Sequence, residues 1–421
     1  MLAKLRQDYS LGGHFPVACG LVDANELLEN NDIDFMSKAM ILAMSEACHA
    51  CPNPSVGCVI VKNNSVISMG ATEVFGKRHA EKVAFDKLIP SFQDKIDVYV
   101  TLEPCTHYGK QPPCSEIFKK FNVRKVVIGS LDPNPSVYKK GLEAMREYCD
   151  VVEFPKLRKE IVSWHLPFFV YTKYKRPYIA LKWAESSNGK LADDDGQSKW
   201  ISNKISRSYT HWLRQKYDAI LVGAQTVLND FPKLNSRLGY LPGKRNPLRI
   251  IFDPKGRIFK EKDAIVLKKI NESTCSSEKK TILVTNLPKK HWSHEFNLIL
   301  NKKDNFNKVV YLESHSNTIE SLLTYLASKD FEDYYGKPFQ SLFVEGGAKT
   351  LSLFIESNNF DAIHRFIGPK SLSGDKHKLN FLDNNFLYNK VELLVSQRIE
   401  DDYLYEYVKK THYGDFFENN L

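Results

Sequence analysis

One histidine and two cysteines, placed far apart along the chain, are the feature that most constrains how this sequence can fold. His79 opens the tripeptide His-Ala-Glu, and each cysteine follows a proline, at Cys105 and at Cys114. One neutral imidazole and two thiolates give Zn²⁺ three ligands and leave its fourth tetrahedral position open for water. A fold in which they act together must bring three distant segments to one point.

Glu81 completes this pattern as the candidate catalytic residue. Zinc-bound water ionises near neutral pH and can attack an electron-poor ring carbon, after which a proton must reach the departing amine. Glu81 lies two residues after His79, where it can take the proton from water and deliver it to the ring nitrogen and the leaving group. This combination of histidine, glutamate and proline-preceded cysteines is typical of zinc deaminases that act on a heteroaromatic ring.

The spacing of the cysteines leaves an alternative open. Cys105 and Cys114 have eight residues between them, whereas the short form of the motif has two. A longer loop can still return the second thiolate to the metal. Taken singly, each cysteine is more often a packed thiol and His79 more often a histidine at a helix end, but the joint pattern favours the metal site.

Length, charge and cysteine usage exclude several classes of protein. A chain of 421 residues is expected to form two domains. It has no run of about 20 apolar residues that could cross a membrane, and its first residues lack a secretory signal, so we expect a cytoplasmic protein. Eight cysteines are too few for a disulfide framework. The net charge of +9 favours anionic partners, but the lysines are scattered without interleaved aromatics, so we expect neither nucleic acid nor membrane as a partner.

Hydrophobic periodicity predicts alternating strands and helices in the first part of the chain. Asn63 and Asn64 tolerate the positive φ of a tight turn, so residues 56–62 and 65–71 are expected to form a β-hairpin. The other expected elements are helices at 35–49, 80–88, 114–121 and 141–148, and strands at 96–102, 123–129 and 151–154. This alternation predicts a sheet layered with helices.

The α/β pattern restarts in the second part of the chain. Residues 172–177 are expected to be a connection, and residues 271–280 a polar surface loop. Strands are expected at 178–184, 219–223, 248–253, 281–285, 308–312 and 341–347. The predicted organisation is therefore an extension at 1–33, a first domain at 34–175 and a second domain at 176–421.

Two smaller motifs have mainly structural interpretations. Cys48 and Cys51 end an apolar helix without a partner pair, so we expect packing and not a second metal or redox site, and Cys58 is expected in the core. Residues 346–347 are a Gly-Gly pair after a strand, which is more often only a turn. It can also open a helix over residues 347–353, whose amino end would face a phosphate.

These motifs resemble the family of bifunctional riboflavin biosynthesis proteins, in which a diaminohydroxyphosphoribosylaminopyrimidine deaminase is fused to a 5-amino-6-(5-phosphoribosylamino)uracil reductase. The resemblance rests on residues 52–62, 79–81, 101–114 and 132–135, and in the second domain on 178–190, 198–202, 211–237 and 344–351. The long cysteine spacing is a property of this family. The resemblance implies a cytidine-deaminase-like three-layer α/β/α domain followed by a dihydrofolate-reductase-like α/β domain.

The resemblance also implies cofactors and site residues. One Zn²⁺ per chain would be bound by His79, Cys105 and Cys114, with Glu81 as proton shuttle and Asn53, His107 and Lys110 as substrate contacts of the deaminase. The reductase would use NADPH. Its substrate would contact Ser198, Arg214, Leu234, Arg237 and Glu345, and its cofactor would contact Ala184, Trp200, Thr226, Asp230, Gly347, Ala348, Lys349, Thr350, Leu351, Ser352 and Leu353. Arg214 and Arg237 suit a phosphate because guanidinium is a bidentate donor, although either can be a plain surface arginine.

The expected function is zinc-dependent hydrolytic deamination of 2,5-diamino-6-(5-phosphoribosylamino)pyrimidin-4-one, followed by NADPH-dependent reduction of the ribosyl chain to ribityl. The partner would be this small molecule, and the resemblance implies a homo-oligomer. Two positions depart from the family pattern, Thr72 in place of a histidine and Asn188 in place of an aspartate. The alternatives are a deaminase with impaired or lost reductase activity, a nucleic-acid deaminase, and a non-catalytic binding module.

Overall fold

The computed structural model describes residues 31–46, 50–89, 94–108, 112–194, 201–236, 246–274, 281–300, 308–312, 318–374, 379, 386 and 389–418. The chain divides into two compact units, and the division falls between Lys175 and Arg176. The described residues from Gly414 onward belong to the first unit, although they follow the second in sequence. Of the expected extension at 1–33, residues 1–30 lie outside the described residues, and residues 31–33 begin the first described helix.

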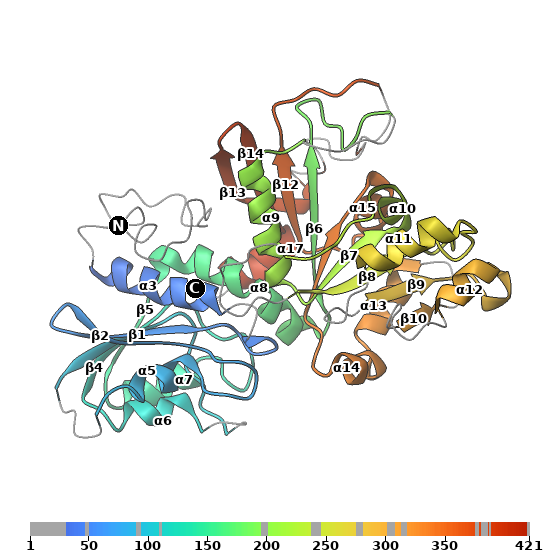
Figure 1. Ribbon diagram of the computed structural model, residues 1–421. Coiled ribbons are helices and arrows are strands. Elements are labelled where there is room, and N and C mark those ends of the chain that lie inside the picture. Colours follow the sequence, from blue (N-terminus) through green and yellow to red (C-terminus); the bar gives the residue numbers. More distant parts are fainter. Residues whose placement is uncertain are drawn as a thin grey trace. The chain divides into compact units, whose positions relative to one another are not determined.

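The first unit is built on a five-stranded sheet with the order β2-β1-β3-β4-β5 (Figure 1). The strands are β1 (Gly57–Lys62), β2 (Ser65–Ala71), β3 (Ile96–Val100), β4 (Val123–Ile128) and β5 (Asp150–Glu153). β1 is antiparallel to both of its neighbours, and β3, β4 and β5 are parallel. Asn63 and Asn64 have φ values of 48° and 59°, so the expected hairpin turn is confirmed.

Helices cover both faces of this sheet (Figure 1). α3 (Asn31–Ser45) and α8 (Arg158–Tyr174) lie on one face, and α5 (Ala80–Phe85), α6 (Cys114–Phe118) and α7 (Lys140–Arg146) lie on the other. Two glycines permit the close approach of helix and strand. A Cβ at Gly57 would lie 1.9 Å from the Ala39 carbonyl oxygen, and a Cβ at Gly70 would lie 2.3 Å from the Ala80 carbonyl oxygen. The three-layer arrangement implied by the resemblance is therefore confirmed.

Helix α8 differs from the sequence prediction. The expected connection at 172–177 is wrong in its first half, because residues 172–174 form the last turn of α8. The helix contains Pro167 and a nearly continuous apolar run, which conceals the helical period. The connection starts at Lys175, whose φ of 54° ends the helix. A short 3₁₀ turn (Pro155–Leu157) precedes α8.

The second unit is built on a nine-stranded sheet with the order β10-β9-β8-β7-β11-β6-β12-β14-β13. Six of its strands were expected: β6 (Tyr178–Glu185), β7 (Ala219–Gly223), β8 (Leu248–Phe252), β9 (Thr281–Thr285), β10 (Lys308–Tyr311) and β11 (Ser341–Glu345). β12 (Ala362–Ile367), β13 (Val391–Ile399) and β14 (Asp402–Lys409) were not predicted. β14 runs antiparallel to both of its neighbours, and the other pairs are parallel.

Helices connect the parallel strands of the second unit. They are α9 (Lys204–Lys216), α10 (Ala224–Asp230), α11 (Ala264–Thr274), α12 (His294–Leu300), α13 (Thr318–Leu326), α14 (Lys329–Tyr335) and α15 (Ala348–Glu356), with a 3₁₀ turn at Lys289–His291. The short helix α17 (Lys410–His412) follows the last strand, and the π-helical turn at Tyr413–Glu418 lies almost entirely in the first unit. The loop expected at 271–280 is wrong for residues 271–274, which are the end of α11, and residues 275–280 lie outside the described residues. β7 and β11 are parallel neighbours, so α10 and α15, which follow them, start at the same edge of the sheet.

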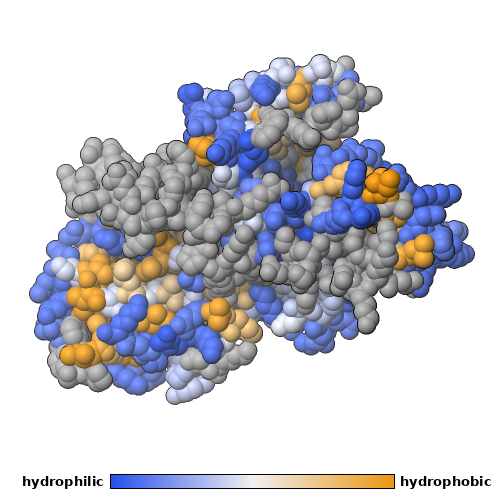
Figure 2. Space-filling model, in the orientation of Figure 1, coloured by the Kyte–Doolittle hydropathy of each residue, from blue (hydrophilic) through white to orange (hydrophobic). Residues whose placement is uncertain are grey.

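The surface is mixed in polarity. In the view of Figure 2, hydrophilic residues dominate the described surface of the second unit, and apolar patches appear on the first. Exposed apolar side chains of the first unit include Val74, Phe75, Ile89 and Tyr108. Within the described residues, no helix is both long and apolar enough to cross a bilayer.

Candidate functional site

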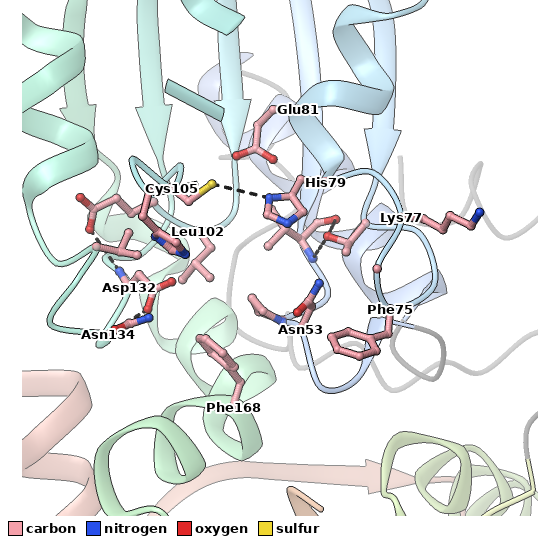
Figure 3. Close-up of a pocket in the computed structure, with 17 residues that line it drawn as sticks. Asn53, Phe75, Lys77, His79, Glu81, Leu102, Cys105, Asp132, Asn134 and Phe168 are labelled. Atoms are coloured by element: carbon pink, nitrogen blue, oxygen red, sulfur yellow. Dashed lines mark hydrogen bonds between the residues drawn. The ribbon is translucent and has the colours of Figure 1, made fainter. Parts of the chain in front are cut away.

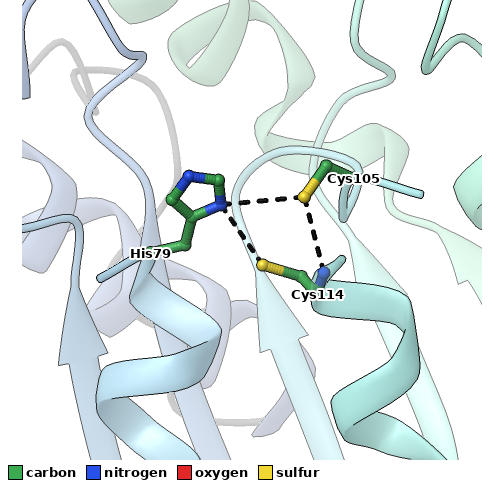
Figure 4. Close-up of side chains that lie close together, drawn as sticks. All are labelled: His79, Cys105 and Cys114. Atoms are coloured by element: carbon green, nitrogen blue, oxygen red, sulfur yellow. Dashed lines mark hydrogen bonds between the residues drawn. The ribbon is translucent and has the colours of Figure 1, made fainter. Parts of the chain in front are cut away.

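The three expected metal ligands lie close together in the first unit (Figure 4). His79 is the residue before α5, Cys105 lies in the loop after β3, and Cys114 is the first residue of α6. The His79 Nδ1 atom lies 3.7 Å from the Cys105 sulfur and 3.3 Å from the Cys114 sulfur. Their three ligand atoms all lie within 4.8 Å of one another, the one such group found among the described residues.

This donor set fits zinc. A tetrahedral ion with bonds of about 2.3 Å to sulfur and about 2.0 Å to nitrogen needs nitrogen and sulfur ligands about 3.5 Å apart. The two nitrogen to sulfur distances, 3.3 and 3.7 Å, lie on either side of that value. Three protein ligands also match the open coordination of catalytic sites, whereas structural sites are closed by four.

The electrostatics around the two sulfurs favour one thiolate even without an ion. Hydrogen bonds from Cys114 and from His79 lower the pKa of Cys105 to about 4. The backbone N–H of Cys114 donates to the Cys105 sulfur at 3.4 Å. The hydrogen bond with Cys105 and the burial of Cys114 raise the pKa of the second thiol well above its ordinary value. A bound cation would remove this asymmetry by stabilising both thiolates.

Glu81 lies in the same cavity as the metal triad. It is the second residue of α5 and is only 4% exposed. Burial raises the pKa of this carboxyl group, although the nearby His79 acts in the opposite direction. A carboxyl group whose pKa moves toward neutrality is suited to both accepting and returning a proton.

The cavity next to the triad has a volume of about 250 Å³ (Figure 3). Two of the three expected substrate contacts, Asn53 and His107, line it together with His79, Glu81 and Cys105. The third, Lys110, lies outside the described residues. The structure thus brings Asn53 and His107, which are 54 residues apart in the sequence, to one cavity beside the metal ligands.

The threonine that departs from the family pattern has a structural role. Thr72 lines the cavity but is only 3% exposed. Its hydroxyl accepts a hydrogen bond from the Val56 N–H at 3.0 Å and donates to the Val56 carbonyl at 3.4 Å. Both interactions tie together the residues that flank the hairpin. Threonine also has no ring nitrogen, so it cannot offer the substrate contact that a histidine would make at this position.

Several cavity residues were missed by the sequence analysis. Asp132 and Asn134 line the cavity from the loop after β4, and Phe75 and Phe168 lie at its mouth (Figure 3). Burial raises the pKa of Asp132 to about 7. The Asp-Pro-Asn-Pro motif at 132–135 was the available signal for the two polar residues. No sequence signal marked Phe168, because α8 itself was not predicted.

In the second unit, two expected substrate residues form a buried ion pair. Arg214 on α9 donates to both carboxylate oxygens of Glu345, at 2.6 Å from Nε and 2.8 Å from Nη2. The two side chains are 13% and 12% exposed. Burial alone would raise the pKa of Glu345, but the charge and hydrogen bonds of Arg214 bring this pKa below its usual value. Arg214 also donates to the Asn235 carbonyl at 3.2 Å, which places it next to Leu234.

Lys182 adjoins this pair and was not predicted as a site residue. It is the register partner of Glu345 where β6 and β11 pair. Burial lowers the pKa of Lys182, and the charge of Glu345 opposes this shift. The signal in the sequence was a lysine inside the otherwise apolar strand at 178–184, where a charge needs a partner or a function.

Expected cofactor residues from two helices converge at the edge where β7 and β11 end. A Cβ at Gly346 would lie 3.9 Å from Thr226 Oγ1 and 3.9 Å from Thr350 Cβ. Gly347 precedes α15, and no side chain caps that helix. The helix expected over 347–353 is confirmed, but Leu351 lies in the hydrophobic core and Leu353 is 42% exposed.

The other expected reductase residues are more dispersed. Ala184 lies near the end of β6, and Asp230 is the exposed last residue of α10. Ser198, Trp200 and Arg237 lie outside the described residues. The described part of the site therefore consists of the ion pair with Lys182 and the strand-to-helix turns beside it.

The second departure from the family pattern, Asn188, is also engaged in structure. Its amide nitrogen donates to the Leu372 carbonyl at 2.8 Å, and its amide oxygen accepts from the Leu372 N–H at 3.1 Å and from Ser186 Oγ at 2.6 Å. An aspartate could keep the two accepted bonds but could not donate to a carbonyl. The asparagine thus fixes the turn after β6 to the segment after β12.

Comparisons with known families match both units. Residues 29–130 match the cytidine and deoxycytidylate deaminase zinc-binding region, and residues 177–405 match the RibD C-terminal domain. The riboflavin biosynthesis protein RibD of Aquifex aeolicus is 35% identical over 353 residues, which is 82% of this chain and 88% of that protein. That of Actinobacillus pleuropneumoniae is 31% identical over 403 residues, 93% of this chain and 98% of the relative.

A solved structure extends this similarity to three dimensions. It is the diaminohydroxyphosphoribosylaminopyrimidine deaminase/5-amino-6-(5-phosphoribosylamino)uracil reductase of Thermotoga maritima, which is 30% identical. The alignment covers 90% of this chain and 99% of that structure, with a TM-score of 0.70. The RibD structure of Acinetobacter baumannii is 26% identical with a TM-score of 0.66 and the same coverage.

Proposed function

The chain belongs to the RibD family of riboflavin biosynthesis proteins, and from that premise we propose which of its residues serve each of the two activities. It is a bifunctional enzyme with a deaminase and a reductase domain, and its cofactors are Zn²⁺ and NADPH. None of the matched names points to the alternatives of a nucleic-acid deaminase or a non-catalytic module. The observation that carries the assignment of residues is the convergence of three metal ligands beside a cavity that two of them line together with the buried carboxyl group of Glu81.

In the deaminase, His79, Cys105 and Cys114 would hold the zinc ion, which when bound supplies a Lewis acid that activates water. Glu81 would accept a proton from that water and pass it to the ring nitrogen, and would then carry the proton of the newly attached hydroxyl to the departing 2-amine. Its burial supports this role, because a carboxyl group screened from solvent does not lose the proton to bulk water before passing it to the substrate. Deamination therefore needs Glu81 at the cavity wall beside the metal and does not need it as a ligand.

The remaining cavity residues orient the substrate. Asn53 has donors and acceptors for the edge of a pyrimidine, and His107 and Lys110 suit the ribosyl phosphate. His107 is exposed at the cavity, as a contact to a charged and solvated phosphate requires. The substrate of this site is 2,5-diamino-6-(5-phosphoribosylamino)pyrimidin-4-one.

In the reductase, Arg214, Glu345 and Lys182 form the polar floor of the substrate site. Glu345 holds the guanidinium of Arg214 in one orientation, so that its remaining N–H groups can bind the substrate phosphate. Ser198, Leu234 and Arg237 complete this site. The dinucleotide phosphate binds at the amino end of α15, where the backbone N–H groups after Gly347 have no capping side chain. Ala184, Trp200, Thr226 and Asp230 line the remainder of the NADPH site, together with residues 347–353.

The finer organisation of the protein is proposed on the same basis. The deaminase domain comprises residues 34–175 and the reductase domain residues 176–421, after an extension at 1–33. The enzyme acts in the cytoplasm as a homo-oligomer on a small-molecule substrate. The uracil product of the first domain is the substrate of the second, in which NADPH supplies a hydride to the ribosyl chain.

The variant Glu81→Gln tests the assignment of roles in the deaminase. It should keep one zinc per chain and lower ammonia release by about 10²- to 10⁴-fold, because the proton transfer is lost while the ligands remain. Elemental analysis and an ammonia assay on the same sample measure both quantities. The matched control is Glu116→Gln, which changes an exposed glutamate on α6 and should leave ammonia release unchanged. Ammonia release near the wild-type rate in Glu81→Gln would overturn the proton role.

A further inference from the structure

One buried carboxylate beside the metal site accepts hydrogen bonds from four backbone N–H groups. Glu103 lies two residues before Cys105 and is 4% exposed. Its Oε1 atom accepts from Gly141 at 2.9 Å and from Leu142 at 3.2 Å. Its Oε2 atom accepts from Asp132 at 3.3 Å and from Lys139 at 3.1 Å. The carboxylate thus has two N–H donors on each oxygen.

All four donors belong to one stretch of chain, from the end of the loop after β4 to the first turn of α7. The same stretch forms a wall of the deaminase cavity through Asp132, Asn134 and Val137. Glu103 binds it at both ends, at Asp132 and at the start of α7. It therefore fixes the position of the wall against the loop that carries Cys105.

The contact between wall and metal loop leaves little room for movement. A Cβ at Gly141 would lie 2.2 Å from the Pro104 carbonyl oxygen and 3.1 Å from Glu103 Oε1. Lys139, with a φ of 60°, turns the chain so that its own N–H group and those of Gly141 and Leu142 can reach the carboxylate. Glu103 also lines the cavity, but both of its oxygens are occupied by backbone N–H groups, so it is placed to act by holding the wall.

We propose that Glu103 is a positioning residue of the deaminase, which holds the wall formed by Asp132, Asn134 and Val137 at the distance from the metal ligands that the pyrimidine substrate requires. This rests on the proposed deaminase site. It assigns the geometry of the substrate wall to a single side chain, whose oxygens are both held by backbone N–H groups.

Glu103→Gln removes this function while changing little in volume. The glutamine amide keeps one oxygen, but its NH₂ group replaces the other oxygen. That NH₂ group then faces two backbone N–H groups, from which it cannot accept hydrogen bonds. One end of the wall must therefore move away from the metal loop. The ligands His79, Cys105 and Cys114 remain, so zinc should still bind at one ion per chain.

The experiment compares Glu103→Gln with the control Glu143→Gln, an exposed glutamate of α7 that makes the same change of charge. Ammonia release, substrate-dependent NADPH oxidation and zinc content are measured on the full-length protein. The KM of deamination should rise by about tenfold in Glu103→Gln, since displacing a binding wall weakens substrate orientation. Zinc content should stay at the wild-type value, and so should NADPH oxidation measured with the deaminated uracil supplied as substrate. Glu143→Gln should match the wild type in all three.

Two outcomes would overturn the proposal. Wild-type KM and kcat for deamination in Glu103→Gln would show that the wall does not depend on this carboxylate. Loss of zinc from a folded Glu103→Gln protein would show that the residue maintains the metal loop itself. If Glu103→Gln does not fold, Glu103→Asp, which keeps both acceptors on a shorter side chain, takes its place and must bind zinc and show the raised KM, or the proposal fails. A wild-type protein that binds zinc but releases no ammonia would instead refute the proposed function.

Discussion

Replacing Arg214 by methionine tests the ion pair at the centre of the reductase. Methionine keeps much of the volume of the arginine stem but leaves the Glu345 carboxylate without the two hydrogen bonds of 2.6 and 2.8 Å. Removing one partner of a buried pair costs about 3–5 kcal/mol. Here Lys182 lies opposite Glu345 in the strand register and offers a second positive charge, so the lower end, about 3 kcal/mol, is expected.

The expected consequences differ between the two units. A loss of about 3 kcal/mol in a unit of this size lowers its melting temperature by about 6–12 °C. The KM of the reductase should rise by about tenfold or more because a charge-assisted phosphate contact is lost, whereas ammonia release should be unchanged. Calorimetry and the two activity assays measure these effects, with Lys204→Met, an exposed cation on the same helix, as control. An equal fall in deamination and reduction would refute the division of labour between the units.

Two further predictions concern residues of the second unit. Asn188→Asp should lower the free energy of unfolding by about 1 kcal/mol, because the carboxylate cannot donate to the Leu372 carbonyl; a higher reductase kcat in this variant would show that the missing negative charge matters more than the hydrogen bond. Asp361 is fully buried. Burial alone would raise the pKa of this carboxyl group, but the hydrogen bonds and charges of Arg176 and His412 lower it to about 2, below its ordinary 3.8. This ionisation contributes about 2 kcal/mol of stability, which is present above pH 4 and lost as the pH falls through 2. The free energies of unfolding in urea of Asp361→Asn and wild type should therefore differ at pH 6 and converge near pH 2. A difference between them that does not depend on pH would contradict the assignment.

The sequence predicted the first unit well because its elements have strong local signals. The hairpin around Asn63 and Asn64 follows from residues that tolerate positive φ, and the short strands read as apolar runs between turns. Helix α8 escaped prediction because Pro167 and an almost unbroken apolar run obscure its period. The boundaries of such a helix depend on the surfaces that it packs against, and a single sequence does not show which surfaces these are.

The last strands of the second unit were missed for a different reason. β13 is mostly half-buried along its length, and β14 carries tyrosines on its more exposed side, so neither shows a clean alternation of apolar and polar residues. The place of β14 in the sheet is set by pairing with β12, which is distant in the sequence, and β13 is placed by pairing with β14. Non-local pairing of this kind cannot be derived from local propensity.

The metal site was the part of the function most accessible from sequence, because zinc chemistry requires particular residue types. Cavity residues such as Asp132 and Phe168 could not be placed without the fold, since their role depends on which surface they face. The structure also gives physical reasons for the two departures. Thr72 and Asn188 are both bound to backbone groups, so their side chains serve the fold where the family pattern suggests a ligand contact.

The most direct test of the account is to remove and restore the metal in one sample of the full-length enzyme. We expect one zinc ion per chain, loss of ammonia release when a chelator removes it, and recovery when zinc is added back, while NADPH oxidation persists throughout when the deaminated uracil is supplied as substrate. A folded, metal-free protein that still releases ammonia at the full rate would contradict the assignment of His79, Cys105 and Cys114 as the centre of the deaminase.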